Sequence, residues 1–445
     1  MITDLKKIFY FIGIGGVGMS ALARLCLKDG YRVYGYDKTS SEITDQLIEM
    51  GIEIKFDSSV KVLKNFLSSN DVQVVYSSAI PNSHPQLAFY KKQGNQVFKR
   101  AEFLASLCSG KKTLAIAGTH GKTTTSSILT HIFSKTDQSF TSVMGGFFNN
   151  SSSNLIQTGS ETFIVEADEY DRSFLYLHPT IACITSLEAD HLDIYKNEAA
   201  FMEAFDQFSN QVSQELIVAY GLPISGLTYG IEVAADYKAF NLKTTEKGYR
   251  FDLATPFGKF KDIIFNQIGI HNVSNALGAI AMSVQAGIEI ERVLPSLRSF
   301  PGVYRRMNLY KWQNIVVIDD YAHHPTEIDS VFGTIKAFYP NQKNCVVFQP
   351  HLFSRTRDFM NDFKTVLSKF DEVILMDIYP AREMPIKGVN AKNLLDGILH
   401  NKVKYIQKNK IKGILETTHA GVVAFLGAGD IGEEVKKLKS EFICL

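Results

Sequence analysis

Short apolar runs alternate with amphipathic stretches along the first hundred residues, and the amphipathic stretches end at glycines. IFYFIGI (residues 8–14) is followed by GMSALARLCLKDG, which ends at Gly30, and YRVYGYD is followed by SEITDQLIEMG, which ends at Gly51. A glycine at the end of an amphipathic stretch is typical of a helix stop, and the apolar run beside it indicates a strand. This alternation predicts an α/β fold with a parallel sheet that carries helices on both faces.

The same alternation returns twice, which divides the chain into three segments. A polar stretch at residues 109–112 breaks the first pattern just before TLAIAG, and a further set of strands and helices begins at NIVVIDDY after Trp312. We therefore predict domains at residues 1–108, 109–312 and 313–445, as the length of the chain allows. Between about Gly226 and Gln267 several short β-type runs predict an antiparallel insert, and HNVSNALGAIAMSVQAG then predicts a helix from its apolar spacing.

The composition narrows the class of partner. The 47 basic and 46 acidic residues nearly balance, which disfavours nucleic acid and anionic membrane surfaces. The five cysteines are scattered and form no C-x-x-C pair, so we expect neither a disulfide framework nor a zinc site. No stretch approaches the roughly 18 apolar residues of a membrane span, and the first apolar run is typical of a strand. We expect a cytoplasmic protein with small-molecule partners and no membrane insertion.

Gly13, Gly15 and Gly18 in GIGGVGMS form a G-x-G-x-x-G motif directly after a strand and at the start of a helix. Glycines in this context let the backbone approach a diphosphate at the positive end of the helix dipole. Asp37, at the end of the second strand, occupies the place of the ribose-binding acid of an NAD enzyme. The motif alone permits an oxidoreductase, and glycines that only form a tight turn are the structural alternative.

AGTHGKTTT, at residues 117–125, is the stronger signal for phosphate binding. A P-loop has the pattern G-x-x-x-x-G-K-[ST], and here Ile116 occupies the first glycine position while Gly121, Lys122 and Thr123 are in register. A loop with Gly118 and Gly121 can still present N–H groups to phosphate, with Lys122 as a point charge and Thr123 as a hydroxyl for magnesium. We expect the Lys122 side chain to be exposed; a lysine on a solvated turn is the structural alternative.

Two acidic clusters follow apolar strands of the same segment. VEADEYDRSF and SLEADHLDIY together contain seven acids and one histidine, namely Glu166, Asp168, Glu169, Asp171, Glu188, Asp190, His191 and Asp193. Carboxylates at the carboxyl ends of strands beside a phosphate loop are well placed to hold magnesium, and an imidazole can join them. We interpret Glu188, Asp171 and Asp193 as solvated loop charges.

Eight ordered motifs cover essentially the whole chain: GIGGVGMS, AGTHGKTTT, EADE, ADHLD, GIHNVSNALGA, PGVYRR, DDYAHHP and FQPHLFSRTR. Together they resemble the Mur ligase family, in the branch that adds L-alanine. The resemblance implies a Rossmann-like N-terminal domain for a UDP-sugar, a central P-loop ATPase-type domain and a Rossmann-like C-terminal domain that brings the amino acid. It further implies that ATP and Mg²⁺ activate the carboxylate of UDP-N-acetylmuramate as an acyl phosphate, from which L-alanine displaces phosphate.

In that family GTxGKT is the expected phosphate loop, so the resemblance accounts for the missing glycine. One departure concerns EADEYDRSFL, where the family more often has EADESDASFL. The helix NEAAFMEAFDQF has no interior lysine to serve as a carbamylated residue between metals, in keeping with the alanine-adding branch.

The resemblance also implies a set of site residues. ATP contacts fall on Gly118, Thr119, His120, Gly121, Lys122, Thr123, Thr124, Asn272, Arg306 and Asp320. Magnesium contacts fall on Thr123, Glu166 and His191. Contacts with the UDP-sugar and the amino acid fall on Gly13, Gly15, Gly16, Gly18, Asp37, Ser78, Tyr321, His351 and Arg355. The residues expected to act in catalysis are Lys122, Glu166, His191, His323, His351 and Arg355.

A histidine of the third segment is the candidate general base, because the ordinary pKa of imidazole lies near neutrality. For His324, packing or helix capping beside Pro325 is an equal alternative to a role in the site. For Arg355, the alternative to substrate binding is an ion pair with Asp358. Three competing functions remain: a ligase that adds a whole tripeptide to the same UDP-sugar, an NAD-dependent oxidoreductase, and a nucleotide-binding regulator without catalysis. We expect a monomer or weak dimer.

Overall fold

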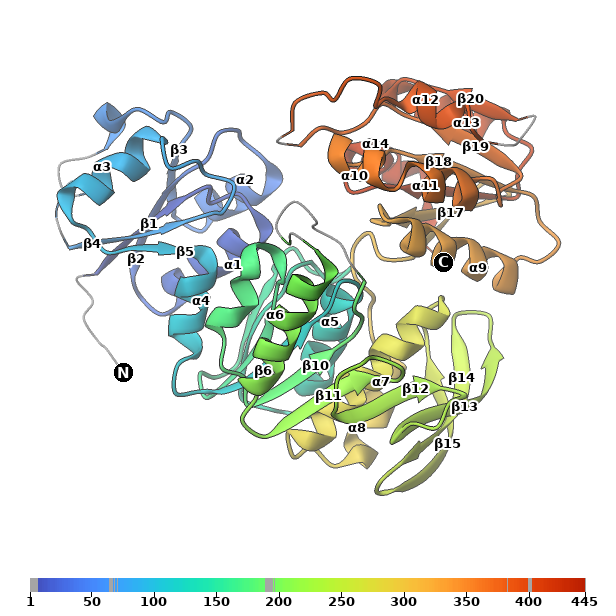
Figure 1. The fold of residues 1–445 in the computed structure, drawn as a ribbon, viewed down its shortest axis with the longest axis horizontal. Helices are drawn as coiled ribbons and strands as arrows, with labels where there is room; N and C mark the ends of the chain where they lie inside the picture. Colours follow the sequence, from blue (N-terminus) through green and yellow to red (C-terminus); the bar gives the residue numbers. More distant parts are fainter. Residues whose placement is uncertain are drawn as a thin grey trace. The chain divides into compact units, whose positions relative to one another are not determined.

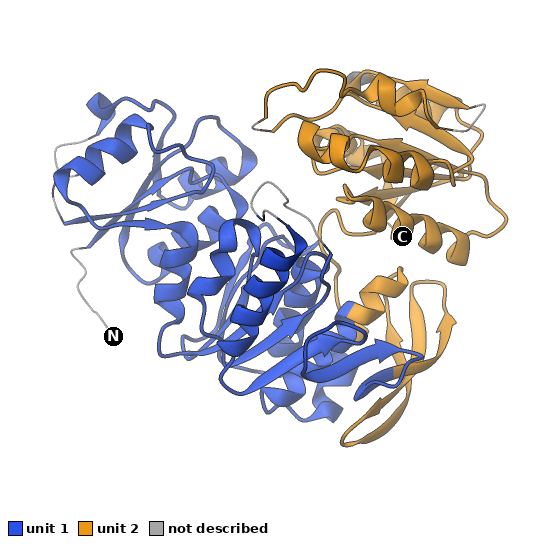
Figure 2. Ribbon diagram, viewed as in Figure 1, with its two compact units in different colours: residues 1–238, 275–296 blue, residues 239–274, 297–445 orange. Residues whose placement is uncertain are grey.

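The computed structural model describes residues 7–63, 67, 69, 71–188, 195, 197–381, 383–398 and 402–444. The chain forms two compact units, shown in blue and orange in Figure 2: residues 1–238 with 275–296, and residues 239–274 with 297–445. Along the chain, the division falls within β13 (Tyr237–Thr244), α7 (Ile270–Gln285) and α8 (Ile290–Leu297). None of the helices among the described residues is long and apolar enough to cross a membrane.

The first unit begins with a five-stranded parallel sheet in the order β3-β2-β1-β4-β5 (Figure 1). Along β1 the side chains of Phe9 and Phe11 join one buried cluster, whereas Ile8, Tyr10 and Ile12 join another. Both faces of the sheet are therefore covered, because successive strand residues point to opposite faces. The elements are β1 (Ile8–Ile12), α1 (Val17–Lys28), β2 (Arg32–Tyr36), α2 (Glu42–Glu49), β3 (Glu53–Lys55), β4 (Val72–Tyr76), α3 (Pro85–Gln93), β5 (Val97–Lys99) and α4 (Arg100–Cys108).

The first unit continues with strands in the order β12-β11-β10-β6-β9-β7-β8, among which β7 and β8 are antiparallel. At the centre of this sheet β6 pairs in parallel with β10 and β9, and α5 follows β6 directly. The elements are β6 (Lys112–Ala117), α5 (Lys122–Lys135), β7 (Thr141–Val143), β8 (Leu155–Gln157), β9 (Thr162–Glu166), β10 (Ile181–Ile184), α6 (Glu198–Asn210), β11 (Glu215–Ala219), β12 (Leu227–Ile231) and, after the insert, α7 and α8 (Ile290–Leu297).

The second unit contains a hairpin of the insert and a seven-stranded sheet in the order β20-β19-β18-β21-β17-β16-β22. In this sheet β16 runs antiparallel to both of its neighbours, β17 and β22. The elements are β14 (Tyr249–Thr255), β15 (Gly258–Phe265), β16 (Asn308–Trp312), β17 (Ile315–Asp320), α9 (Pro325–Phe338), β18 (Asn344–Phe348), α10 (Phe353–Asp358), α11 (Met360–Leu367), β19 (Glu372–Leu375), α12 (Ala391–Leu395), β20 (Val403–Tyr405), α13 (Ile411–Thr417), β21 (Val422–Leu426), α14 (Ile431–Lys437) and β22 (Ile443–Cys444).

The predicted α/β class and the helix stops at Gly30 and Gly51 are confirmed, and both glycines have positive φ. Two details differ from the sequence-based expectation. The insert was predicted to be antiparallel from about Gly226, yet its first strand, β12, is parallel to β11. The strand Asn308–Trp312 precedes the predicted boundary at 312/313 but pairs with β17, because the turn at residues 313–314 folds it back as a hairpin. The three domain ranges themselves stay a prediction.

Candidate active site

The phosphate loop joins the end of β6 to the start of α5. Gly118 and Gly121 have φ of 122° and 86°, where an L side chain is strained. A Cβ at Gly118 would collide with Thr185 and Ser186, and one at Gly121 would collide with Asn275. Ile116, at the position of the missing first glycine, is a fully buried residue of β6. The loop therefore starts later than in the strict pattern, and its two glycines are required by the backbone.

Lys122 is not exposed, contrary to the expectation from the sequence. Its Nζ donates to the carbonyl oxygen of Gly118 at 2.6 Å and lies 2.7 and 3.0 Å from the two carboxylate oxygens of Glu169. The exposed fractions of the two side chains are 15% and 1%. Burial by itself lowers the pKa of Lys122, but the carboxylates of Glu169, Asp168 and Glu166 outweigh burial and raise it. Lys122 therefore carries its charge at neutral pH.

Glu166 and Thr123 lie together beside this lysine. Thr123 Oγ1 donates to Glu166 Oε2 at 3.1 Å, and Glu166 Oε1 accepts from Ser126 Oγ at 3.0 Å and from the Gly145 amide at 2.8 Å. A hydroxyl and a carboxylate are oxygen donors of the kind that magnesium prefers, so this pair fits the predicted metal site. The third predicted metal ligand, His191, lies outside the described residues.

The remaining loop residues are fixed by neighbours in the same unit. The backbone N–H of His120 donates to Ser186 Oγ at 2.8 Å, and its ring Nε2 is 3.2 Å from Glu188 Oε2. Thr119 Oγ1 donates to the Glu188 carbonyl at 2.9 Å, and Thr124 is buried in the first turn of α5. Glu188 thus contacts the loop through its carbonyl and its carboxylate, and its side chain is still 39% exposed, as expected of a loop charge.

Asp171 pairs with Lys99 at 2.9 Å, and both side chains are 39% exposed, so it is a loop charge with a surface ion pair. Asp190 and Asp193, the other acids of the second cluster, lie outside the described residues. Asp168, two residues after Glu166, pairs with Arg100 at 3.6 Å and accepts from the Tyr170 amide at 3.2 Å.

The first glycine loop follows β1 and is closed by Asp37. Asp37 Oδ2 accepts a hydrogen bond from the Gly15 amide at 2.7 Å, so its carboxylate holds the loop. Gly13 has φ 83°, and a Cβ there would lie 3.2 Å from Cβ of Ser77. Ser77 is therefore the residue after β4 that contacts this loop, whereas the predicted Ser78 is exposed in the following turn.

In the second unit, Asp320 ends β17 and organises the backbone around it. Its Oδ2 accepts from the Met307 amide at 2.6 Å and its Oδ1 from the Ala322 amide at 2.7 Å. Burial raises the pKa of Asp320 to about 6. Arg306 packs against the Tyr321 ring at 5.1 Å, and Asn272 Nδ2 donates to the Ile268 carbonyl at 2.8 Å.

Four rings form a row next to Asp320. The centroids of Tyr321 and His323 are 5.4 Å apart, those of His323 and His351 are 5.9 Å apart, and His351 stacks on Tyr379 at 5.7 Å and 13°. The structure thus brings together Tyr321, His323 and His351, as predicted for one substrate site. Arg355 is buried in α10. Asp358, the alternative ion-pair partner predicted for Arg355, instead pairs with Arg357 at 2.7 Å.

Glu327, in the first turn of α9, holds His323 in place. Its Oε2 accepts from the backbone N–H groups of His323 at 2.9 Å and His324 at 3.2 Å, and lies 3.2 Å from His323 Nδ1. Burial lowers the pKa of His323 to about 3, against the opposing effect of Glu327. The argument for a general base from an ordinary imidazole pKa therefore does not hold for His323. His324 caps α9 through a bond from the Thr326 amide to Nδ1, as one of the two alternatives predicted.

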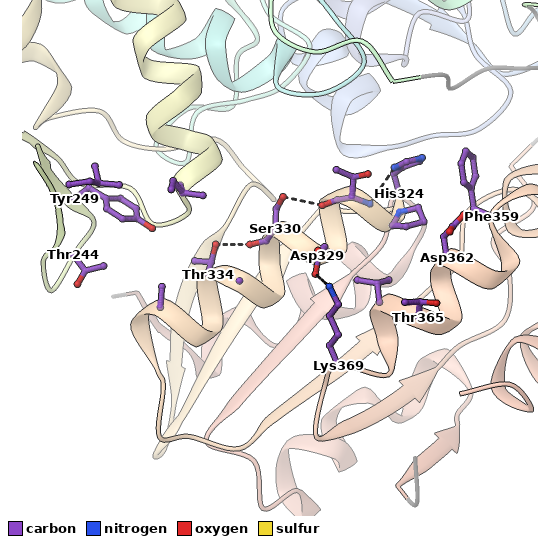
Figure 3. Close-up of a pocket in the computed structure, with 17 residues that line it drawn as sticks. Thr244, Tyr249, His324, Asp329, Ser330, Thr334, Phe359, Asp362, Thr365 and Lys369 are labelled. Atoms are coloured by element: carbon purple, nitrogen blue, oxygen red, sulfur yellow. Dashed lines mark hydrogen bonds and ion pairs between the residues drawn. The ribbon is translucent and has the colours of Figure 1, made fainter. Parts of the chain in front are cut away.

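A cavity of about 860 Å³ lies in the second unit, between the insert and the helices of the C-terminal sheet (Figure 3). It is lined by Tyr249, His324, Phe359 and the Asp329–Lys369 ion pair, among others. His324 is the one residue considered for the site that lines it, and the rings of Tyr321, His323 and His351 do not. The cavity is therefore separate from the row of rings.

Three family models match successive parts of the chain. Residues 8–112 match "Mur ligase family, catalytic domain", residues 116–283 match "Mur ligase middle domain", and residues 305–429 match "Mur ligase, glutamate ligase domain". The chain belongs to the Mur ligase family.

Individual Mur ligases are similar to it over nearly their full length. The UDP-N-acetylmuramate–L-alanine ligase of Christiangramia forsetii is 46% identical over 442 residues, which cover 98% of either chain. The enzyme of the same name from Flavobacterium psychrophilum is 46% identical, with 97% of either chain covered. Among solved structures, UDP-N-acetylmuramate–alanine ligase from Thermotoga maritima matches with a TM-score of 0.84 at 26% identity over 98% of either chain.

Three residues contact predicted site residues although the sequence indicated no such contact. Glu169 stood in the quoted EADE cluster, but nothing in the sequence indicated that it meets Lys122. Glu327 lies three residues after His324, the spacing of a capping box, which could have revealed it. Tyr379 follows the apolar strand β19, where site residues of parallel sheets gather.

Proposed function

We propose that this Mur ligase joins L-alanine to UDP-N-acetylmuramate at the expense of ATP, with Mg²⁺ as cofactor. The observation that carries the proposal is the 46% identity to L-alanine ligases over 98% of the chain. The phosphate loop, with Lys122 and Thr123 beside Glu166, supplies the parts that phosphoryl transfer to a carboxylate needs.

We assign the phosphoryl-transfer steps to residues of the first unit. The N–H groups of the loop and the charge of Lys122 bind the β and γ phosphates of ATP. Magnesium, held by Thr123 and Glu166 together with His191, would neutralise charge on the transferred group. The carboxylate of UDP-N-acetylmuramate attacks the γ-phosphate, which gives an acyl phosphate and ADP.

The amino acid belongs to the second unit in this proposal. Arg355 offers a guanidinium for the carboxylate of L-alanine, and Tyr321 and His351 offer ring surfaces beside it. The amine attacks the acyl carbon and phosphate leaves, after the ammonium has lost a proton. The low pKa of His323 makes it a weak base, so we assign the proton-accepting role to His351. Asn272, Arg306 and Asp320 are assigned to the nucleoside part of ATP.

One assay tests the proposal. Release of ADP is measured with ATP, magnesium and UDP-N-acetylmuramate, in parallel with L-alanine, glycine, L-serine and the tripeptide of the recycling ligases. We expect turnover to be fastest with L-alanine and to stop without the UDP-sugar. A preference for the tripeptide would instead establish the recycling reaction, and tight NAD binding would revive the oxidoreductase.

A further inference from the structure

Arg100 lies against the third glycine of the first loop. A Cβ built on Gly18 would be 3.1 Å from Nη1 of Arg100, 3.2 Å from its Cδ and 3.5 Å from its Nε. Arg100 is the first residue of α4, more than 80 positions further along the chain, and its side chain is about a quarter exposed, at 26%. The guanidinium therefore occupies the space next to the glycine loop that a residue-18 side chain would otherwise fill.

This contact gives a physical reason for glycine at position 18. The residue lies in the first turn of α1, where alanine is the better helix former, and its φ is not in the left-handed region. The three nearest heavy atoms to the added Cβ all belong to Arg100. Glycine here makes room for the arginine side chain rather than for an unusual backbone.

Among the described residues, the same guanidinium has a loose partner in Asp168. Its Nη2 is 3.6 Å from Asp168 Oδ2, and the Asp168 side chain is 40% exposed. A pair at this distance and exposure is weak, so it leaves donors of the guanidinium available to an anion. Asp168 also lies two residues after Glu166, so Arg100 is placed between the first glycine loop and the acidic cluster.

We infer that Arg100 is a substrate-binding residue that contacts the diphosphate of UDP-N-acetylmuramate. The inference rests on the proposed function and on the expectation that the glycine loop at residues 13–18 binds that diphosphate. A planar guanidinium forms two parallel hydrogen bonds to phosphate oxygens and supplies positive charge that backbone N–H groups lack. The place of the guanidinium beside Gly18, in the space that a side chain there would fill, is the reason to assign the diphosphate rather than the lactyl carboxylate.

The first test compares Arg100→Ala and Arg100→Lys with the parent enzyme. We expect Arg100→Ala to raise the KM for UDP-N-acetylmuramate about tenfold or more, with the KM for ATP and L-alanine changed less than twofold, roughly as for loss of a charged hydrogen bond. Arg100→Lys should recover part of the loss. Arg250→Ala is the control, since Arg250 forms an exposed pair with Asp262 on the β14–β15 hairpin.

Free UDP separates the diphosphate from the carboxylate. The inhibition constant of UDP, which has the diphosphate but no muramic acid, should rise in Arg100→Ala by the same factor as the KM. An unchanged inhibition constant would overturn the diphosphate assignment. A lower melting temperature with an unchanged KM would show that Arg100 only pairs with Asp168, and would overturn the inference. If the parent enzyme does not use UDP-N-acetylmuramate at all, the proposed function itself fails, which is a distinct result.

A double-mutant cycle with Gly18 provides an independent test. Gly18→Ala should displace the guanidinium and raise the KM for UDP-N-acetylmuramate a few-fold, roughly in proportion to the lost contact. In the Arg100→Ala background the same substitution should raise the KM less than in the parent enzyme and should raise the melting temperature, because alanine favours the helix. Equal effects of Gly18→Ala in both backgrounds would contradict the close approach of Arg100 as the reason for glycine.

Discussion

At the scale of single residues, the buried pair of Lys122 and Glu169 most changes the interpretation of the sequence. A lysine expected to serve only phosphate has a carboxylate at 2.7 Å that is 1% exposed. Breaking a buried pair by removing one partner leaves an uncompensated charge and costs roughly 3 to 5 kcal/mol, whereas replacing both partners costs far less. Lys122 therefore contributes to the stability of the first unit as well as to the site.

The first prediction concerns both residues of this pair. We expect Lys122→Met to abolish ATP turnover and to destabilise the protein by about 3 kcal/mol, because Glu169 is left charged and buried. Adding Glu169→Gln should restore most of the stability but none of the activity. Urea unfolding and an ADP-release assay on the single and double variants measure the two effects. Full activity of Lys122→Met would show that the phosphate loop is not part of the active site.

His271, next to Asn272, supplies a pH-dependent prediction. Burial lowers the pKa of His271 to about 4, and its Nδ1 is buried without a hydrogen-bond partner. The folded state therefore favours the neutral ring, so stability is present above the ordinary pKa of about 6.5 and is lost as the pH falls toward 4.

Between pH 7 and pH 5 this residue alone should cost up to about 2 kcal/mol of unfolding free energy. In His271→Gln the corresponding part of the pH dependence should be missing, which denaturant titrations of the parent and the variant at both pH values would measure. The same pH dependence of unfolding free energy in both proteins would contradict the prediction, because it would show that burial does not keep His271 neutral in the folded state.

At the scale of elements, the start of α9 carries three linked roles. His324 is the N-cap, Pro325 is the first helical residue, and Glu327 closes the capping box while it contacts the His323 ring. The Glu327 carboxylate therefore fixes both the N-terminus of α9 and the orientation of the His323 ring.

Substitutions of Glu327 should separate these roles. Glu327→Ala loses the cap and should destabilise the protein by about 1 kcal/mol, together with a fall in kcat, because the His323 ring loses its anchor. Glu327→Gln can still accept the backbone bonds and contact the His323 ring, so it should keep most of the melting temperature and most of kcat. Identical kcat values in the parent and in both variants would mean that Glu327 serves the helix alone.

Helices and strands could largely be predicted from the sequence, whereas contacts between them could not. The strands around the phosphate loop and the helix stops at Gly30 and Gly51 were predictable, because periodicity and glycine act locally. Partners distant in the sequence were not: Lys122 and Glu169 are 47 positions apart, and only the pairing of β6 with β9 brings them together. The strand β16 was missed for a related reason, since its membership of the sheet depends on the turn that follows it.

At the scale of the whole molecule, the predicted site residues divide between the two compact units. Those assigned to phosphate and the UDP-sugar lie in the first unit, and those assigned to the amino acid, Tyr321, His351 and Arg355, lie in the second. If these three residues select the amino acid, substitutions of them should change the KM for the amino acid and leave the KM values for ATP and the UDP-sugar unchanged. Alanine offers a carboxylate, an ammonium and a methyl group, so its recognition needs a cation and a wall that excludes longer side chains.

The last prediction tests this division with Arg355 and Tyr321. Arg355→Ala should raise the KM for L-alanine about tenfold or more and leave the KM for ATP and the UDP-sugar near the parent values, since a charged hydrogen bond to the carboxylate is lost. Tyr321→Ala should raise the relative turnover of larger amino acids, because a methyl-sized pocket discriminates by only about 1 to 3 kcal/mol per methylene. Steady-state kinetics with L-alanine, L-serine and L-valine, beside melting curves, measure both. A loss of stability in Arg355→Ala with an unchanged KM for L-alanine would assign this arginine to the structure of α10 instead.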